Sequence, residues 1–207
     1  MHMETFANPS LTLLTDSTRY GELDFDLIEG AIEGGVDMIQ LREPAFTENK
    51  IIKTGNLIKE ITENKALFIF NGNPKIAHKI NADGVQLPES RIDTVAADIP
   101  KGLLIGRSIH SKTTALKSEK AGADFLIAGT LFKSNSHLEI DPSGLSLIST
   151  LCKVLRIPIL GIGGINADNA ESVIKAGAHG IAVISSIWSA SNPKDAAKTL
   201  KQKLVVN

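Results

Sequence analysis

The chain has 207 residues, of which 43% are hydrophobic, and a formal net charge of -1. This length can bury one sizeable core, and the balanced charge argues against a basic surface that binds nucleic acid. No run of 18 or more apolar residues indicates a membrane span, so we expect a small molecule as partner.

Short apolar runs rich in β-branched residues alternate with longer segments of helical period. The predicted strands are residues 11–15, 38–41, 66–70, 84–87, 104–106, 125–128, 159–162 and 180–184. The predicted helices are residues 24–33, 48–62, 74–80, 92–98, 113–121, 145–155, 168–175 and 194–204. The alternation continues without a break in composition, which predicts one domain over residues 1–207, with 1–10 as a short N-terminal extension.

Eight buried strands separated by helices predict an α/β fold, a single (β/α)₈ TIM barrel. The alternative is a doubly wound open sheet, which would place a glycine-rich turn after the first strand. In this chain the sequence Leu-Thr-Asp-Ser follows the first strand, and the glycines come after the seventh.

Four similar turns precede predicted strands, at residues 34–38, 81–85, 122–125 and 177–181. Each has glycine or asparagine, which tolerate positive φ, at the end of a helix. We expect these turns at the bottom of the barrel. The single cysteine, Cys152, lies in an apolar helical pattern, which predicts a buried, inert thiol. No signal peptide opens the chain, so a cytoplasmic location is expected.

The active site of a barrel lies at the carboxyl ends of its strands, where phosphate is frequently bound by the loops after strands seven and eight. Gly163 and Gly164 follow the seventh predicted strand, and Ile184 and Ser185 lie at the end of the eighth. Glycine lets the backbone approach an anion closely. These four residues are therefore the predicted phosphate site.

Other polar residues stand at the same ends of the strands. Arg42 fits a carboxylate or a phosphate, and Glu43 can work as an acid, a base or an acceptor. The polar loop 133–141 either closes over a ligand and brings His137 inward or is simply solvated. The predicted substrate-binding residues are Gln40, Arg42, Asn71, Gln86, Ser108, His110, Thr130, Ser134 and Ser136.

With these residues assembled, the chain resembles the thiamine-phosphate synthase and TenI superfamily over nearly its whole length. The resemblance rests on residues 13–16, 36–43, 82–87, 105–111, 122–125, 158–165 and 177–187. It implies a barrel that holds a thiazole phosphate, with the phosphate at Gly163, Gly164, Ile184 and Ser185.

The resemblance implies two reactions, of which the first is the synthase reaction. Thiamine-phosphate synthases join a pyrimidine diphosphate to thiazole phosphate with Mg²⁺ held by carboxylates. This chain departs from their pattern at four places. Gly72 replaces an aspartate, Glu89 is the only carboxylate near the loop after strand four, and Pro44 and His137 replace lysines.

The second reaction is that of the TenI branch, which the loops at residues 70–72, 85–88 and 106–111 resemble in detail. Its enzymes tautomerise a thiazole phosphate carboxylate, which needs a general acid/base but no metal. Where that branch has a histidine after the sixth strand, this chain has Thr130, which cannot titrate near neutral pH. Glu43 is the first candidate to replace it, and His137 and His110 follow.

The leading prediction is therefore a TenI-like isomerase with no cofactor and no metal. A divergent synthase that uses Mg²⁺ is the first alternative, and a ligand-binding protein without turnover is the second. Thiazole phosphate is the expected ligand of each, and the sequence leaves a homo-oligomer open.

Overall fold

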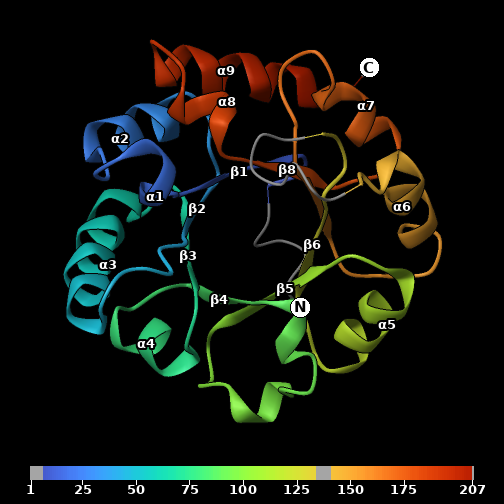
Figure 1. Cartoon of the computed structure of the whole chain (residues 1–207), viewed down its shortest axis with the longest axis horizontal. Helices are drawn as coiled ribbons and strands as arrows, with labels where there is room; N and C mark the ends of the chain where they lie inside the picture. The colour runs from blue at the N-terminus through green and yellow to red at the C-terminus, as the bar shows by residue number, and fades with distance from the viewer. Residues whose placement is uncertain (1–6, 134–140, 207) are drawn as a thin grey trace.

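A computed structural model describes residues 7–133 and 141–206. Its eight parallel strands are hydrogen-bonded in sequence order, and β8 pairs with β1 to close a barrel inside a ring of helices (Figure 1). The strands are β1 Ser10–Leu14, β2 Met38–Leu41, β3 Leu67–Asn71, β4 Gly84–Leu87, β5 Leu104–Ile109, β6 Phe125–Gly129, β7 Ile159–Ile162 and β8 Gly180–Val183. The predicted fold class is confirmed.

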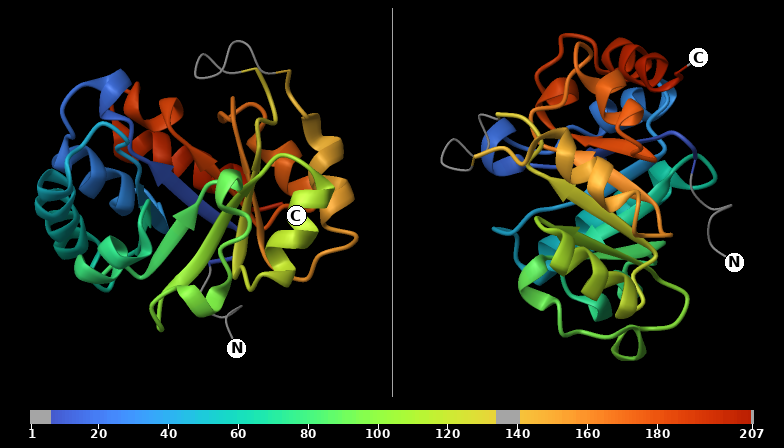
Figure 2. Two further views of the ribbon diagram at one scale, coloured as in Figure 1. Left: turned by 60° about the horizontal axis from the view of Figure 1, so that its bottom comes forward. Right: turned by 90° about the vertical axis from the view of Figure 1, so that its right-hand side faces the viewer.

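Longer helices follow most of the strands and cover the outer face of the sheet (Figure 2). They are α2 Phe25–Glu33, α3 Glu48–Thr62, α4 Pro74–Lys79, α5 Lys112–Lys120, α6 Gly144–Leu151, α7 Ala170–Lys175 and α9 Pro193–Leu204. No helix within the described ranges has the length and apolar character needed to cross a bilayer.

Alternation along the strands divides the core into two layers, because successive strand residues point to opposite faces. Inward-facing residues such as Met38, Ile69 and Phe125 fill the barrel, and outward-facing residues such as Phe68 and Leu126 pack against the helices. Each named residue is fully buried. This is why the strands read as continuous apolar runs in the sequence.

The helix predicted over residues 92–98 is wrong. The connection from β4 to β5 instead holds two short 3₁₀ turns, η2 Glu89–Arg91 and η3 Ala96–Asp98. The cause is the buried Arg107 of β5, whose guanidinium donates to the carbonyls of Arg91, Ile92 and Thr94. The guanidinium holds the segment in turns closed by i to i+3 bonds, in which the carbonyl of Arg91 also accepts from the N–H of Thr94.

Two short helices at the mouth of the barrel were not predicted. Helix α1, Ser17–Tyr20, follows β1, and α8, Ser185–Trp188, follows β8. Strand boundaries also differ: β1 begins one residue early, at Ser10, β3 ends at Asn71, β5 extends to Ile109, and β8 stops before Ile184. Ile184 therefore caps α8 instead of ending a strand.

Three of the four predicted turns contain an aspartate that ties two strands together at the bottom of the barrel. Asp37 accepts from the N–H of Leu11 at 2.7 Å, Asp83 from Phe68 at 2.7 Å, and Asp124 from Ile105 at 2.8 Å. In the fourth turn His179 takes this place, and its Nδ1 accepts from the N–H of Ile159 at 3.3 Å. In each case a side chain just before one strand accepts from a backbone N–H of the preceding strand, and we call this hydrogen bond a clamp. The barrel repeats it four times, between β1 and β2, β3 and β4, β5 and β6, and β7 and β8.

Candidate functional site

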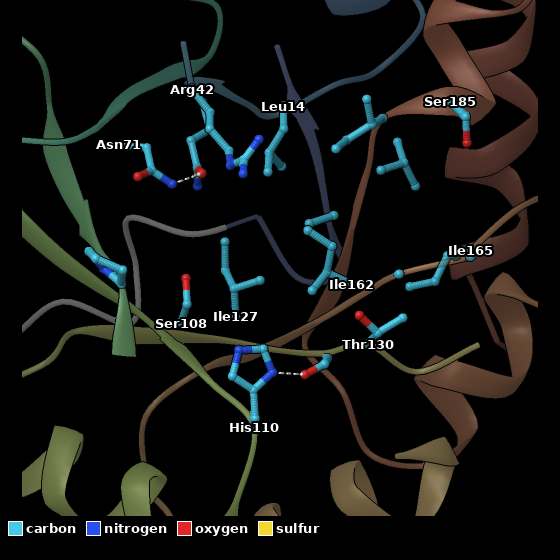
Figure 3. Close-up of a pocket in the computed structure, with 18 of the residues that line it drawn as sticks. Leu14, Arg42, Asn71, Ser108, His110, Ile127, Thr130, Ile162, Ile165 and Ser185 are labelled. Atoms are coloured by element: carbon cyan, nitrogen blue, oxygen red, sulfur yellow. Dashed lines mark hydrogen bonds between the residues drawn. The ribbon is translucent and has the colours of Figure 1, made fainter. Parts of the chain in front are cut away.

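A cavity of about 360 Å³ opens at the carboxyl ends of the strands (Figure 3). Its floor is apolar, because inward-facing strand residues such as Leu14, Ile127 and Ile162 end there. Polar groups stand around this floor. The residues that line the cavity are Leu14, Gln40, Arg42, Pro44, Asn71, Pro88, Ser108, His110, Ile127, Gly129, Thr130, Ile162, Gly163, Gly164, Ile165, Ala182, Val183, Ile184 and Ser185.

One wall is the turn after β7, where Gly163 and Gly164 have φ of 101° and 64°. Side chains rarely adopt this conformation, and a Cβ on Gly164 would lie 2.4 Å from the carbonyl oxygen of Lys133. The hydroxyl of Ser186 donates to the carbonyl of Ile165 at 2.6 Å and so links this turn to α8. The wall therefore presents bare backbone beside the first turn of a helix.

The opposite wall carries polar side chains from β2, β3 and β5, and Gln86 of β4 supports it from behind the cavity surface. Asn71 Nδ2 donates to Gln40 Oε1 at 2.9 Å, and Gln86 Nε2 donates to Ser108 Oγ at 2.9 Å. Gln40 Nε2 is buried and has no partner among the described residues. Since a buried donor without a partner is costly, this amide is available to an acceptor in the cavity.

Arg42 follows the last residue of β2, on the side of the polar wall. Figure 3 shows its side chain on the cavity side, near Asn71. Its backbone N–H donates to Thr15 Oγ1 at 3.0 Å, and the N–H of Thr15 donates to the carbonyl of Gln40 at 3.0 Å. The loop after β1 therefore fixes the backbone from which the guanidinium extends.

Glu43 does not project into the cavity as expected. It is 4% exposed, and both of its carboxylate oxygens accept from the N–H of Ser17, each at 3.1 Å. The hydroxyl of Ser17 also donates to Oε2. Its partner, Ser17, is the first residue of α1 and lies 26 residues earlier in the chain, which the local sequence pattern does not reveal.

His110 lines the cavity from the end of β5. Its Nδ1 contacts the carbonyl oxygen of Gly129, and its Nε2 lies 3.7 Å from Glu89 Oε2. A carbonyl only accepts, so Nδ1 is the donor in this contact. The side chain is 58% exposed, which keeps it accessible to a ligand and to solvent.

Comparison with known proteins agrees with this geometry. The family model described as "Thiamine monophosphate synthase" (TMP-TENI) matches residues 11–187. The chain belongs to the TMP-TENI family. A thiamine-phosphate synthase from Pyrococcus furiosus is 36% identical over 194 residues, 93% of each chain. A putative thiamine-phosphate synthase 2 from Aquifex aeolicus is 35% identical over 179 residues, 86% of this chain and 96% of that protein.

A solved structure gives the same result for the TMP-TENI barrel. The thiamine phosphate pyrophosphorylase from Pyrococcus furiosus superposes with a TM-score of 0.82 at 31% identity, covering 95% of this chain and 96% of that chain. The resemblance to the superfamily is confirmed. These relatives are named as synthases, so they do not support the narrower TenI assignment.

The structure gathers most of the predicted residues of this TMP-TENI protein at one cavity. Gln86 lies behind the cavity surface, where its side chain fills the space beside Gly106 and holds Ser108. The apolar floor was missed, although the inward alternation of strand ends could have revealed it. Ser134, Ser136 and His137 lie outside the described residues.

The synthases of this family imply Mg²⁺, which binds carboxylate and other oxygen ligands. Within residues 7–133 and 141–206, no three His, Cys, Asp or Glu side chains lie close enough to hold a metal ion. Glu43 is already bound by Ser17, and Glu89 lies beside the imidazole of His110. The described side chains therefore do not fit a metal site built by the protein.

Proposed function

We propose that this TMP-TENI protein is a transferase of thiamine biosynthesis that joins a pyrimidine diphosphate to a thiazole phosphate. The observation that carries the proposal is the cavity itself, with its bare-backbone wall and apolar floor. It occurs in a chain that is similar over 93% of its length to a protein named for this activity.

The two ends of the cavity suit the two ends of such a reaction. The phosphate of the thiazole would lie against Gly163, Gly164, Ile184 and Ser185, where backbone groups can donate to an anion. The ring would cover the apolar floor. Arg42 would stand at the other end, where its guanidinium suits a diphosphate.

The transfer forms one bond and breaks one. The thiazole nitrogen attacks the methylene carbon of the pyrimidine, and the electrons of the C–O bond leave with pyrophosphate. Arg42 would stabilise the negative charge that develops on the leaving group, and His110, when both ring nitrogens carry a proton, would do the same from Nε2. The amide of Gln40, whose Nε2 lacks a partner among the described residues, would orient the pyrimidine.

A second candidate is the tautomerisation of a thiazole phosphate carboxylate. It is favoured by the ionisable side chains of the cavity lining. Among the described lining residues these are Arg42 and His110, with no carboxylate. Arg42 would bind the substrate carboxylate, and His110 would move the proton, for which neither a metal nor a diphosphate is needed.

Product analysis separates the two reactions. The protein is incubated with thiazole phosphate and pyrimidine diphosphate, with and without Mg²⁺, and separately with the thiazole phosphate carboxylate. Thiamine phosphate in the first mixture supports the transferase. Isomerisation without metal, and no thiamine phosphate, supports the second candidate. The variant His110→Gln is expected to slow either reaction. If the wild type converts neither substrate, both candidate functions are wrong.

A further inference from the structure

The buried carboxylate of Glu43 has a role that the proposed reaction does not use. It joins the loop after β2 to the first residue of α1, Ser17, through the N–H and the hydroxyl of that serine. Because a carboxylate is an acceptor only, it satisfies both donors at once. Hydrogen bonds to a charged acceptor are stronger than neutral ones. Glu43 therefore fixes α1 at the rim of the barrel.

Helix α1 is in turn joined to α8 on the phosphate side of the cavity. Tyr20, the last residue of α1, stacks on Trp188 with ring centroids 6.3 Å apart and planes inclined by 19°. The indole N–H of Trp188 donates to the carbonyl of Leu14 at 2.7 Å, which anchors α8 to β1. Ser185, at the other end of α8, lines the cavity. A continuous set of contacts thus runs from Glu43 to the phosphate wall.

The same carboxylate follows directly on Arg42 in the chain. We propose that Glu43 is a positioning residue that holds Arg42 at a fixed separation from the phosphate wall, so that the site selects ligands with two anionic groups. This inference rests on the proposed function, since it takes the phosphate wall and Arg42 as the two ends of the ligand site. The second anionic group is the diphosphate of a transfer donor or the carboxylate of a tautomerase substrate.

The two conservative replacements of Glu43 separate positioning from acid/base catalysis. In Glu43→Gln the amide oxygen can still accept from the N–H of Ser17, and the NH₂ group can donate to the serine hydroxyl. This variant should keep kcat within about twofold and change the pH profile little. Glu43→Ala removes the link, and misplacement by about 1 Å can cost roughly 100-fold.

The test measures dissociation constants by calorimetry at a temperature where every variant is folded. The probes are inorganic phosphate, thiazole phosphate, the thiazole phosphate carboxylate, and the pyrimidine diphosphate with thiazole phosphate present. Two of these probes supply a second anionic group: the thiazole phosphate carboxylate, and the pyrimidine diphosphate with thiazole phosphate. For whichever of the two the wild type binds, Glu43→Ala should raise the dissociation constant by about 10-fold or more. The dissociation constant of inorganic phosphate should stay within about twofold. Ser17→Ala should give a smaller change of the same kind, and Glu29→Ala, an exposed carboxylate on α2, should give none.

Each other result contradicts a specific statement. If Glu43→Gln abolishes turnover while binding is unchanged, Glu43 is catalytic and the positioning role is wrong. If Glu43→Ala weakens inorganic phosphate as much as the two-anion ligand, the loss is general and the role in spacing is wrong. A wild-type protein that binds no thiazole ligand overturns the proposed function, whereas wild-type binding that Glu43→Ala leaves intact overturns the Glu43 assignment alone.

Discussion

Replacing His179 tests the fourfold clamp at the bottom of the barrel. His179 accepts from the N–H of Ile159 where Asp37, Asp83 and Asp124 accept at the other three clamps. The imidazole distance of 3.3 Å is longer than the three carboxylate distances. His179→Asp should therefore restore a shorter, charge-assisted bond, whereas His179→Ala leaves the N–H without this acceptor.

The magnitudes follow from the kind of bond. Leaving a buried donor unpaired costs about 1–3 kcal/mol, so His179→Ala should lower the free energy of unfolding by that amount. A hydrogen bond to a charged group contributes about 1.5–3 kcal/mol against about 0.5–1.5 for a neutral one, so His179→Asp should gain about 1 kcal/mol. For a chain of this size 1 kcal/mol shifts Tm by about 2–4 °C.

The pH dependence of stability provides a second test of the environment of His179. Burial lowers the pKa of His179 below its ordinary value of 6.5. The unfolded state then binds the proton more tightly than the folded state, so protonation favours unfolding. The free energy of unfolding is therefore highest above the unfolded pKa and falls as the pH decreases toward the folded pKa. The wild type should therefore lose stability below about pH 6.5 relative to His179→Asn, which has no such titration.

The assay is thermal and urea unfolding of the wild type and the His179 variants at pH 7.5 and at pH 5.5. A His179→Asp variant less stable than His179→Ala at pH 7.5 would refute the clamp argument, because the carboxylate would then gain nothing from the N–H of Ile159.

Two further predictions concern the mouth and the connection beside it. Gly164→Ala should reduce the binding of inorganic phosphate at least 10-fold in calorimetry, since a Cβ there meets the carbonyl of Lys133 at 2.4 Å and a positive φ costs about 1–2 kcal/mol. Unchanged phosphate affinity would remove the turn from the site. Arg107→Met should lower stability by about 3–5 kcal/mol and expose the 88–103 segment to limited proteolysis, because three carbonyls lose their donor. Equal proteolysis rates for variant and wild type would contradict this role of Arg107.

Periodicity was sufficient to predict the barrel, because the strands are buried on both faces and most of the covering helices repeat their apolar residues every three to four positions. It failed over residues 92–98, where the decisive group, Arg107, comes from the following strand. No local pattern reports that a guanidinium from elsewhere will take a segment's carbonyls.

The candidate site, too, was predictable from the sequence only in part. The glycine turn after β7 was predictable because φ above zero restricts the residue type directly. The placement of Glu43 was not predictable, since the mouth position is common to catalytic and structural carboxylates and Ser17, at the start of α1, lies 26 residues earlier. The place of Gln86 depends on the space left by Gly106, which only the packing of two neighbouring strands defines.

In the proposed function, the phosphate of a thiazole phosphate binds where β7 and β8 end. A crystal structure of the protein with thiazole phosphate measures this directly. We expect phosphate density within hydrogen-bond distance of the backbone N–H groups at Gly164 and Ser185, with the ring over Ile127 and Ile162. Phosphate density at Arg42, with the glycine turn empty, would contradict it.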